Sequence, residues 1–314
     1  MKLKTYPNLD PELFDIVAAI DEDFSTPPHL LAAVDFRTIM DGLAARSELK
    51  RPTGVKVSER DIAGAGVKVR EYSRDNSPSR AVLMYMHGGG WTVGGLDSHD
   101  GVCADICAQT GMSVVSVEYS LAPEHRYPVA LNECLAVYSD IRRGLGNRYP
   151  GHDRIIVGGD SAGANLATAL CLKHRDGGKE QPAGQVLIYP CVAVDFDLPS
   201  YTSQANAPFL YRDLMEVFWK NYLGPALVGD HYACPAQAAD LSALAPAVVM
   251  TAALDPLVDE GDRYAASLTR AGVPVFHRRA EHLIHGYLRF RTVSGMARDE
   301  FDYLVRALRV LAGD

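Results

Sequence analysis

The sequence lacks the features that mark several protein classes. No apolar run approaches the roughly 18 residues that a membrane-spanning helix needs, so we expect no membrane partner. Its first residues carry charge but no apolar segment of the signal-peptide type. The 31 Lys and Arg are scattered and outnumbered by 39 Asp and Glu, for a net charge of -8. Nucleic acid is therefore not an expected partner, because its binding needs a basic face.

Paired cysteines are also missing. The chain has six cysteines, and none forms a Cys-x-x-Cys pair. Cys103 and Cys107 lie four residues apart on an expected helix, where thiols fill core space. A reduced, cytoplasmic setting fits this usage. His282 and His285 form a His-x-x-His pair, but no third ligand stands at helical spacing, so we expect no zinc site.

Strand and helix signals alternate along most of the 314 residues. Residues 55–62 and 67–72 each alternate apolar with polar side chains, and a Gly-Ala-Gly turn joins them, which predicts an antiparallel pair. Further strands are expected at residues 81–86, 113–117, 154–157, 185–189, 247–251 and 273–277. Helices are expected at about 97–109, 129–142 and 296–311, and after residue 161. This alternation predicts an α/β fold with a mostly parallel central sheet flanked by helices.

Two segments fall outside this alternation. Residues 1–54 read as a helical arm, with helices at 11–20 and at about 29–48, whose role is packing, part of a lid over a pocket, or both. Residues 191–240 carry a helical run at 213–222 and no clear strand, and we interpret them as an insertion over the active site. The remaining residues, 55–190 and 241–314, form the expected core.

The strongest motif is Gly159-Asp160-Ser161-Ala162-Gly163, a Gly-x-Ser-x-Gly sequence. An apolar strand leads into it and a small-residue helix leads out, which is the context of a nucleophile elbow. There a serine stands on a sharp turn at the positive end of the following helix. The motif predicts that Ser161 is a catalytic nucleophile.

A nucleophilic serine needs a base and an orienting carboxylate, and both candidates follow in the chain. Asp255 comes directly after the expected strand 247–251, and His285 follows the expected last strand. The order Ser, Asp, His is that of an α/β-hydrolase. Asp259 is a rival for the carboxylate, although with Glu260 it suits the start of a helix better.

A glycine run follows the third strand as His87-Gly88-Gly89-Gly90-Trp91. Such glycines let backbone N–H groups approach a substrate oxygen, so we expect an oxyanion hole made by Gly88, Gly89 and Ala162. His87 is interpreted as a residue that shapes this loop. The candidate pocket aromatics, for which simple packing is the alternative, are Trp91, Phe209, Tyr211, Phe218, Trp219 and Tyr287.

These motifs together resemble the hormone-sensitive lipase-like family of α/β-hydrolase esterases. The resemblance also rests on the sequences Tyr-Ser-Leu-Ala-Pro-Glu at 119–124 and Asp-Pro-Leu-Val-Asp-Glu at 255–260. It implies a helical cap built from the arm and the insertion. It further implies hydrolysis of short- to medium-chain acyl esters through an acyl-enzyme, with no cofactor. Two positions depart from the family, Ser120 (commonly Arg) and Ala164 (commonly Gly), and we expect these to affect packing.

The expected function is therefore that of a serine carboxylesterase acting on a small-molecule ester. An amidase or aryl formamidase on the same scaffold is the nearest alternative. A non-catalytic small-molecule receptor and a lipase for long-chain fats are the others. A homodimer formed through the edge strand near residues 273–276 is also possible, although Pro274 weakens that case.

Overall fold

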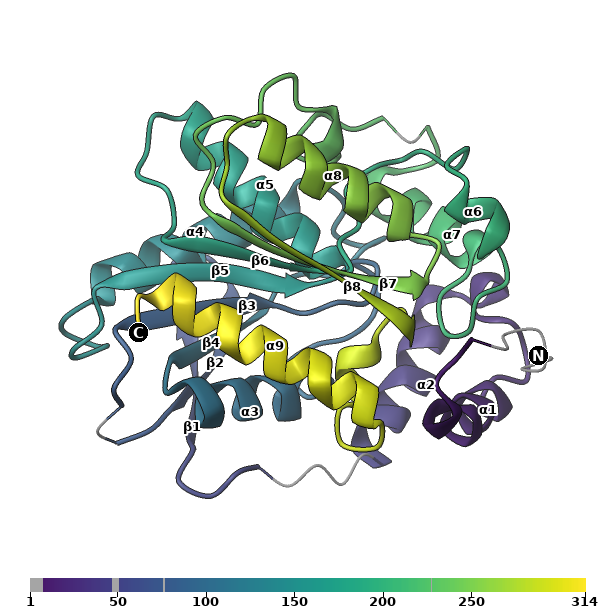
Figure 1. The fold of residues 1–314 in the computed structure, drawn as a ribbon, viewed down its shortest axis with the longest axis horizontal. Coiled ribbons are helices and arrows are strands. Elements are labelled where there is room, and N and C mark those ends of the chain that lie inside the picture. The colour runs from purple at the N-terminus through teal and green to yellow at the C-terminus, as the bar shows by residue number, and fades with distance from the viewer. Residues whose placement is uncertain (1–7, 47–50, 76, 227) are drawn as a thin grey trace.

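The computed structural model describes residues 8–46, 51–75, 77–226 and 228–314. Its centre is an eight-stranded sheet in the order β1-β2-β4-β3-β5-β6-β7-β8 (Figure 1). The first two strands pair antiparallel, β2 also pairs antiparallel with β4, and every other pair is parallel. The strands are β1 (Lys56–Ile62), β2 (Val67–Ser73), β3 (Ala81–Met86), β4 (Ser113–Glu118), β5 (Arg154–Asp160), β6 (Gly184–Ile188), β7 (Ala247–Leu254) and β8 (Val275–Ile284). The predicted mostly parallel α/β sheet is confirmed.

Helices cover both faces of this sheet, which explains why the central strands are apolar throughout. All six residues of β3 are buried. On one face α4 (Val129–Gly144), α5 (Ala162–Asp176) and α8 (Val258–Arg270) pack into one apolar cluster. On the other face α3 (Asp100–Thr110) and α9 (Gly295–Ala312) pack into a second cluster (Figure 1).

Strand β8 is longer than the sequence indicated. The expected segment 273–277 covers only its start, and the strand continues to Ile284. Because β8 is an edge strand, its middle is polar, and His277, Arg278 and Arg279 are exposed. Its last two residues are apolar and buried. Charged side chains on an edge strand discourage pairing with another chain. A homodimer through this edge stays a prediction.

The N-terminal arm consists of η2 (Pro11–Leu13), α1 (Phe14–Glu22), η3 (Pro28–Leu30) and α2 (Ala33–Arg46). The second helix begins later than expected because the 3₁₀ turn η3 precedes it, and the expected end near residue 48 lies outside the described residues. Asp10 fixes the arm to the core: its N–H donates to the His282 carbonyl at 2.9 Å, and it accepts from Ser294 Oγ at 2.5 Å.

Residues 191–240 contain α6 (Ser200–Ser203), α7 (Arg212–Leu223) and η4 (Pro235–Gln237), and their described part has no strand. Helix α7 lies with α6 at the same end of the molecule as α1 and α2 (Figure 1). Its apolar side packs against the glycine loop: Trp91 stacks on Tyr222 at 4.0 Å between ring centroids and contacts Trp219 at 4.7 Å.

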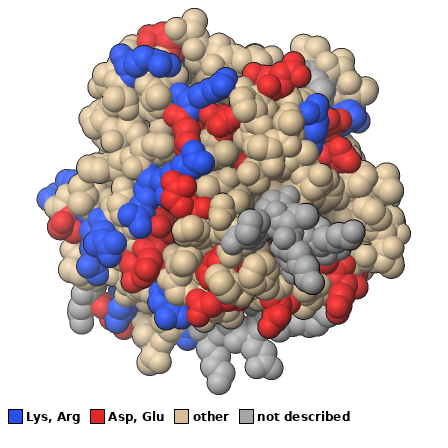
Figure 2. Space-filling model, turned by 45° about the vertical axis from the view of Figure 1, so that its right-hand side comes forward, with Lys and Arg blue, Asp and Glu red and all other residues tan. Residues whose placement is uncertain are grey.

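The two departures from the family pattern differ in burial, and Ser120 is only half-buried. Ser120 donates from its N–H and its Oγ to the two carboxylate oxygens of Glu133, at 2.7 and 2.6 Å. Ala164 is fully buried in α5. On the face shown in Figure 2, basic and acidic side chains are interspersed. Within the described part of the chain, no helix has the length and apolar character required to cross a membrane.

Candidate active site

Ser161 lies on the sharp turn between β5 and α5, at the N-cap of that helix. Its backbone is strained, with φ 56° and ψ -120°. A non-glycine residue with positive φ costs free energy and is found mostly where function holds it in place. The turn aims the serine at the carboxyl end of the sheet, where the N-terminal dipole of α5 favours negative charge.

The glycines beside this turn are needed because neighbouring backbone packs closely against them, and not because their own dihedral angles are unusual. A Cβ on Gly159 would lie 2.1 Å from the Met86 carbonyl oxygen, and one on Gly163 would lie 2.0 Å from the same atom. The turn can therefore press against the end of β3 only because both positions lack a side chain. The positive φ falls on Ser161 itself.

The structure brings Ser161, His285 and Asp255 together from three different loops. Ser161 Oγ lies 2.9 Å from His285 Nε2, and His285 Nδ1 lies 2.7 Å from Asp255 Oδ2. The second oxygen of Asp255 accepts from the Leu257 N–H at 2.9 Å. All three side chains are almost fully buried, at 6%, 5% and 0% exposed respectively. Such a chain of hydrogen bonds lets the imidazole take a proton from the hydroxyl.

Asp259, the rival candidate for the triad carboxylate, forms its hydrogen bond outside the active site. Asp259 Oδ2 accepts from the Ser200 N–H at 2.9 Å and caps the region of α6.

His282 is exposed and bonds to the Asn8 carbonyl through Nδ1 at 2.9 Å. Among the described residues, no group of three or more His, Cys, Asp or Glu side chains is placed to hold a metal ion.

The glycine loop lies opposite the elbow, and its first glycine differs from expectation. The Gly88 N–H donates to Asp160 Oδ1 at 3.0 Å, so this donor is already committed. No such partner is seen for the N–H groups of Gly89 and Gly90 within the described residues. As the first residue of α5, Ala162 also has no carbonyl partner for its N–H within the helix. Gly90, which was not predicted from the sequence, thus replaces Gly88 as a candidate donor.

Asp160 holds the loop and the elbow together. It accepts from Tyr85 OH at 2.8 Å as well as from Gly88, and His99 Nε2 lies 3.2 Å from its Oδ1. Burial would raise the pKa of Asp160, but His99, the hydrogen bond from Tyr85 and the nearby His285 together outweigh burial, and the pKa falls below its usual range. His87 shapes the loop by bonding to the Gly88 carbonyl, and burial lowers its pKa to about 4, so it stays neutral.

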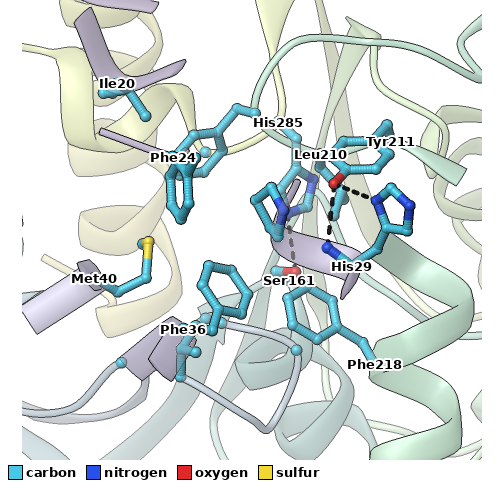
Figure 3. A pocket seen from close by; sticks show the side chains of 18 of the residues that line it. Ile20, Phe24, His29, Phe36, Met40, Ser161, Leu210, Tyr211, Phe218 and His285 are labelled. Atoms are coloured by element: carbon cyan, nitrogen blue, oxygen red, sulfur yellow. Dashed lines mark hydrogen bonds between the residues drawn. The ribbon is translucent and has the colours of Figure 1, made fainter. Parts of the chain in front are cut away.

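A cavity of about 610 Å³ has Ser161 and His285 in its wall (Figure 3). Its volume is typical of a small-molecule site. The arm and the insertion meet across it: Tyr211 OH bonds to His29 Nδ1 at 2.9 Å. Both segments supply apolar lining, namely Ile20, Phe24, Phe36 and Met40 from the arm and Phe209, Leu210, Tyr211 and Phe218 from the insertion.

The aromatic candidates divide evenly between lining and packing. Phe209, Tyr211 and Phe218 line the cavity. Trp91, Trp219 and Tyr287 are buried in the packing behind it. The positions of Phe24 and Phe36 in the cavity wall were not predicted from the sequence, although the arm that carries them was expected to be helical. Their placement depends on how the arm folds across the end of the sheet, which no local pattern encodes.

Comparison with known proteins agrees with this architecture. The profile of a family described by its α/β-hydrolase fold matches residues 83–289, which include the elbow, both acidic candidates and His285. The chain belongs to the α/β-hydrolase family.

Relatives within this α/β-hydrolase family carry esterase names. The carboxylesterase NlhH of Mycobacterium tuberculosis is 38% identical over 82% of this chain and 85% of its own length. The esterase LipI of the same organism is 36% identical over 93% of this chain and 97% of its own. A solved bacterial heroin esterase superposes with a TM-score of 0.88 at 33% identity, covering 98% of this chain and 99% of its own. The chain is an enzyme of this family, and these relatives are named as hydrolases of carboxylic esters.

Proposed function

We propose that this enzyme is a serine carboxylesterase of the hormone-sensitive lipase-like group, acting on short- to medium-chain acyl esters. The observation that carries the proposal is the Ser161–His285–Asp255 hydrogen-bond chain in the wall of a largely apolar cavity. The esterase names of the relatives favour esters over amides as the substrate class.

In the acylation step, Ser161 Oγ attacks the ester carbonyl carbon while its proton moves to His285 Nε2. Asp255 keeps Nδ1 protonated and stabilises the imidazolium that forms. The carbonyl oxygen becomes an oxyanion, for which we propose the N–H groups of Gly89, Gly90 and Ala162 as donors. When the tetrahedral intermediate collapses, the C–O bond to the alcohol breaks and His285 returns its proton to the departing oxygen.

In the deacylation step, water takes the place of the alcohol. His285 removes a proton from the water as its oxygen attacks the acyl carbon of the acyl-enzyme. Collapse of the second tetrahedral intermediate releases the acid, and Ser161 Oγ regains a proton from His285. Apart from the ester and water, every group that acts in the two steps belongs to this chain.

We propose that the arm and residues 191–240 act together as a cap that sets the acyl-chain preference. The ring of Phe36 stacks on that of Phe218 at 6.1 Å between centroids, and both line the cavity. This stack joins α2 to α7 across the pocket. A cavity of about 610 Å³ closed in this way accommodates a short or medium acyl chain better than a long one.

The test is hydrolysis of a p-nitrophenyl ester series from acetate to palmitate by the wild type and by Ser161→Ala. We expect an optimum at short to medium chains and a loss in kcat on the order of 10⁶-fold in the variant, as in another serine hydrolase. Residual activity above about a hundredth of wild type would reject Ser161 as the nucleophile. A substrate ester and its amide isostere measured side by side would separate the esterase from an amidase.

A further inference from the structure

Arg289 lies in the wall of the active-site cavity, four residues after His285. It belongs to the short 3₁₀ turn η5 (Tyr287–Phe290), which follows the loop that carries His285. The side chain is half-buried. Its guanidinium lies over the ring of Phe209, with 5.8 Å between Cζ and the ring centroid. Arg289 thus reaches the cavity from a core segment, the same short segment that carries the proposed base, and contacts a cap residue.

The guanidinium of Arg289 has no polar partner within the described residues, and this distinguishes it from comparable arginines. Arg291, two residues later, is held by Asp105, and Arg70 is held by three carboxylates. Arg60 is held by Glu71 and Asp140. Of the arginine side chains that the structure describes and that are not exposed, Arg289 is the one without a hydrogen bond or an ion pair.

The Asp160 carboxylate acts electrostatically on Arg289, although no hydrogen bond or ion pair joins the two side chains. Burial lowers the pKa of Arg289, and the charge of Asp160 works against that effect. Yet the Asp160 carboxylate is already bound at close range by His99, whose Nε2 lies 3.2 Å away, and by the Tyr85 hydroxyl and the Gly88 N–H. A guanidinium remains charged at any ordinary pH. A positive charge with five donors therefore faces the cavity without an acceptor.

Most other acidic groups that line the cavity come from the cap, and Asp160, at the end of β5, lines it from the core. Asp21 and Asp41 belong to the arm, and Asp213 belongs to α7. Asp41 is exposed, and the Asp213 side chain is 66% exposed, so water and salt screen both. The cavity thus has screened acidic groups on its cap side and Arg289 on its core side. The core carboxylate of Asp160 is 4% exposed, and its oxygens already accept hydrogen bonds. An anionic group that enters the cavity is attracted by Arg289 and repelled by the acidic groups, so we expect it to lie beside the guanidinium.

We propose that Arg289 is a specificity-determining residue that binds a free carboxylate on the ester substrate. The inference rests on the proposed esterase function and narrows its substrate class to esters that carry a carboxylate in addition to the scissile bond. A planar guanidinium matches a carboxylate with two parallel hydrogen bonds, which adds geometry to the charge attraction. Arg289 takes no part in the bond-breaking steps, so its contribution is to binding and orientation.

The carboxylate has two possible positions in such a substrate. It stands on the acyl part in a monoester of a dicarboxylic acid, and on the alcohol part in an acylated hydroxy acid. Monoethyl adipate represents the first, with ethyl hexanoate as its neutral counterpart. Acetoxyacetate represents the second, with propyl acetate as its neutral counterpart. Preference for one anionic ester over the other assigns the side of the scissile bond that Arg289 faces.

The experiment measures kcat and KM for these four esters by pH-stat titration with wild type, Arg289→Gln, Arg289→Lys and the control Arg306→Gln. Arg306 is exposed on α9, so the control removes the same charge away from the cavity. We expect Arg289→Gln to lower kcat/KM for the preferred anionic ester by about 10- to 100-fold, mainly through KM, because it removes a charged hydrogen bond. For the neutral esters, kcat/KM should change less than about threefold, because Arg289 takes no part in the chemistry.

Arg289→Lys keeps the charge and should retain part of the preference, whereas Arg306→Gln should retain all of it. A binding readout is independent of turnover: adipate should raise the Tm of Ser161→Ala and fail to raise that of the same variant carrying Arg289→Gln. Equal losses for neutral and anionic esters would overturn the inference and leave the esterase proposal intact. A wild type that hydrolyses none of the four esters or the p-nitrophenyl series would instead reject the esterase proposal.

Discussion

Asp255 and Asp259 carry the same chemical group four residues apart, yet their surroundings give them different partners. Asp255 is fully buried and lies 2.7 Å from His285 Nδ1. Asp259 accepts from the Ser200 N–H and has no contact with the imidazole. The position at the end of β7, rather than the carboxylate itself, is what selects one of them for the proposed triad.

Substituting asparagine at each of these positions tests which of the two carboxylates belongs to the proposed triad. Asp255→Asn should lower kcat by about 10⁴-fold, because the amide cannot hold the imidazole in the required tautomer. Asp259→Asn is the matched control and should keep kcat within about tenfold, since it only weakens a cap of α6. Steady-state kinetics on one p-nitrophenyl ester suffice. Comparable losses in both variants would contradict the assignment of Asp255.

The sequence located the reactive side chains better than it located the oxyanion donors. Ser161, Asp255 and His285 follow strand ends, and parallel strands bring their carboxyl ends to one edge. The sequence could not show that Gly88 is unsuitable as an oxyanion donor. The reason is a hydrogen bond from its N–H to Asp160, a residue 72 positions away. Arg289 was missed for a related reason. Only the folded chain shows that this arginine lacks a partner.

At the scale of elements, Glu260 connects α8 to the start of the insertion. It is 2% exposed, and its Oε1 accepts from the Val192 N–H at 2.7 Å. Burial raises its pKa to about 8, despite the hydrogen bonds that it accepts. The folded protein therefore holds a proton on Glu260 across a pH range in which the unfolded chain has released it.

The proton on Glu260 makes the stability of the fold depend on pH, with a sign that can be worked out. Between about pH 4.5, the ordinary value, and about pH 8, the folded state binds more protons than the unfolded state at this site, so the stability contribution falls as pH rises. Glu260→Gln removes the titration and keeps an acceptor for Val192. Its Tm relative to wild type should therefore increase by a few °C from pH 5 to pH 9. A constant Tm difference across that range would contradict the account.

The stacked rings of Phe36 and Phe218 connect α2 to α7 over the cavity. Phe218 also fills the space above Gly90, where an added Cβ would lie 2.2 Å from its ring. Replacing Phe218 by Leu shortens this wall while keeping the position apolar.

Phe218→Leu should therefore shift the acyl preference toward longer chains. One additional methylene that fits a pocket is worth about 10-fold or more in kcat/KM, so the ratio of longer to shorter esters should rise by about that factor. The p-nitrophenyl series measures this ratio directly. Leu223→Ala, at the end of the same helix and absent from the cavity wall, is the control. An unchanged profile in Phe218→Leu would show that the stack does not limit chain length.

Periodicity identified the elements that have one buried face and failed where an element is mostly exposed. The helices α4 and α9 have apolar stripes and were predicted within a few residues of their ends. Half of the residues of β8 are polar, and most are exposed because it is an edge strand, so its length was underestimated. The arm was recognised as helical, but its position across the cavity depends on tertiary contacts such as the His29–Tyr211 hydrogen bond.

At the scale of the whole molecule, all six cysteines are buried as free thiols on both sides of the sheet. Burial raises the pKa of each, to about 11 for Cys107 and Cys234. Thiolates are the reactive form, and these sites suppress them.

The native protein should therefore react with almost none of an excess of Ellman's reagent at pH 7.5, and the denatured protein should release six equivalents. Activity should survive the same treatment, since the proposed nucleophile is an oxygen. Rapid labelling of a native thiol with loss of activity would mean that a cysteine lies within reach of the active site.

The most direct test of the central claim is covalent trapping of the nucleophile. A p-nitrophenyl alkylphosphonate mimics the tetrahedral intermediate and should bond to the serine oxygen with release of one equivalent of nitrophenolate. We predict that mass spectrometry will find the phosphonyl group on the peptide containing Ser161 and that Ser161→Ala will remain unlabelled. A label on any other residue, or equal labelling of the variant, would contradict the account.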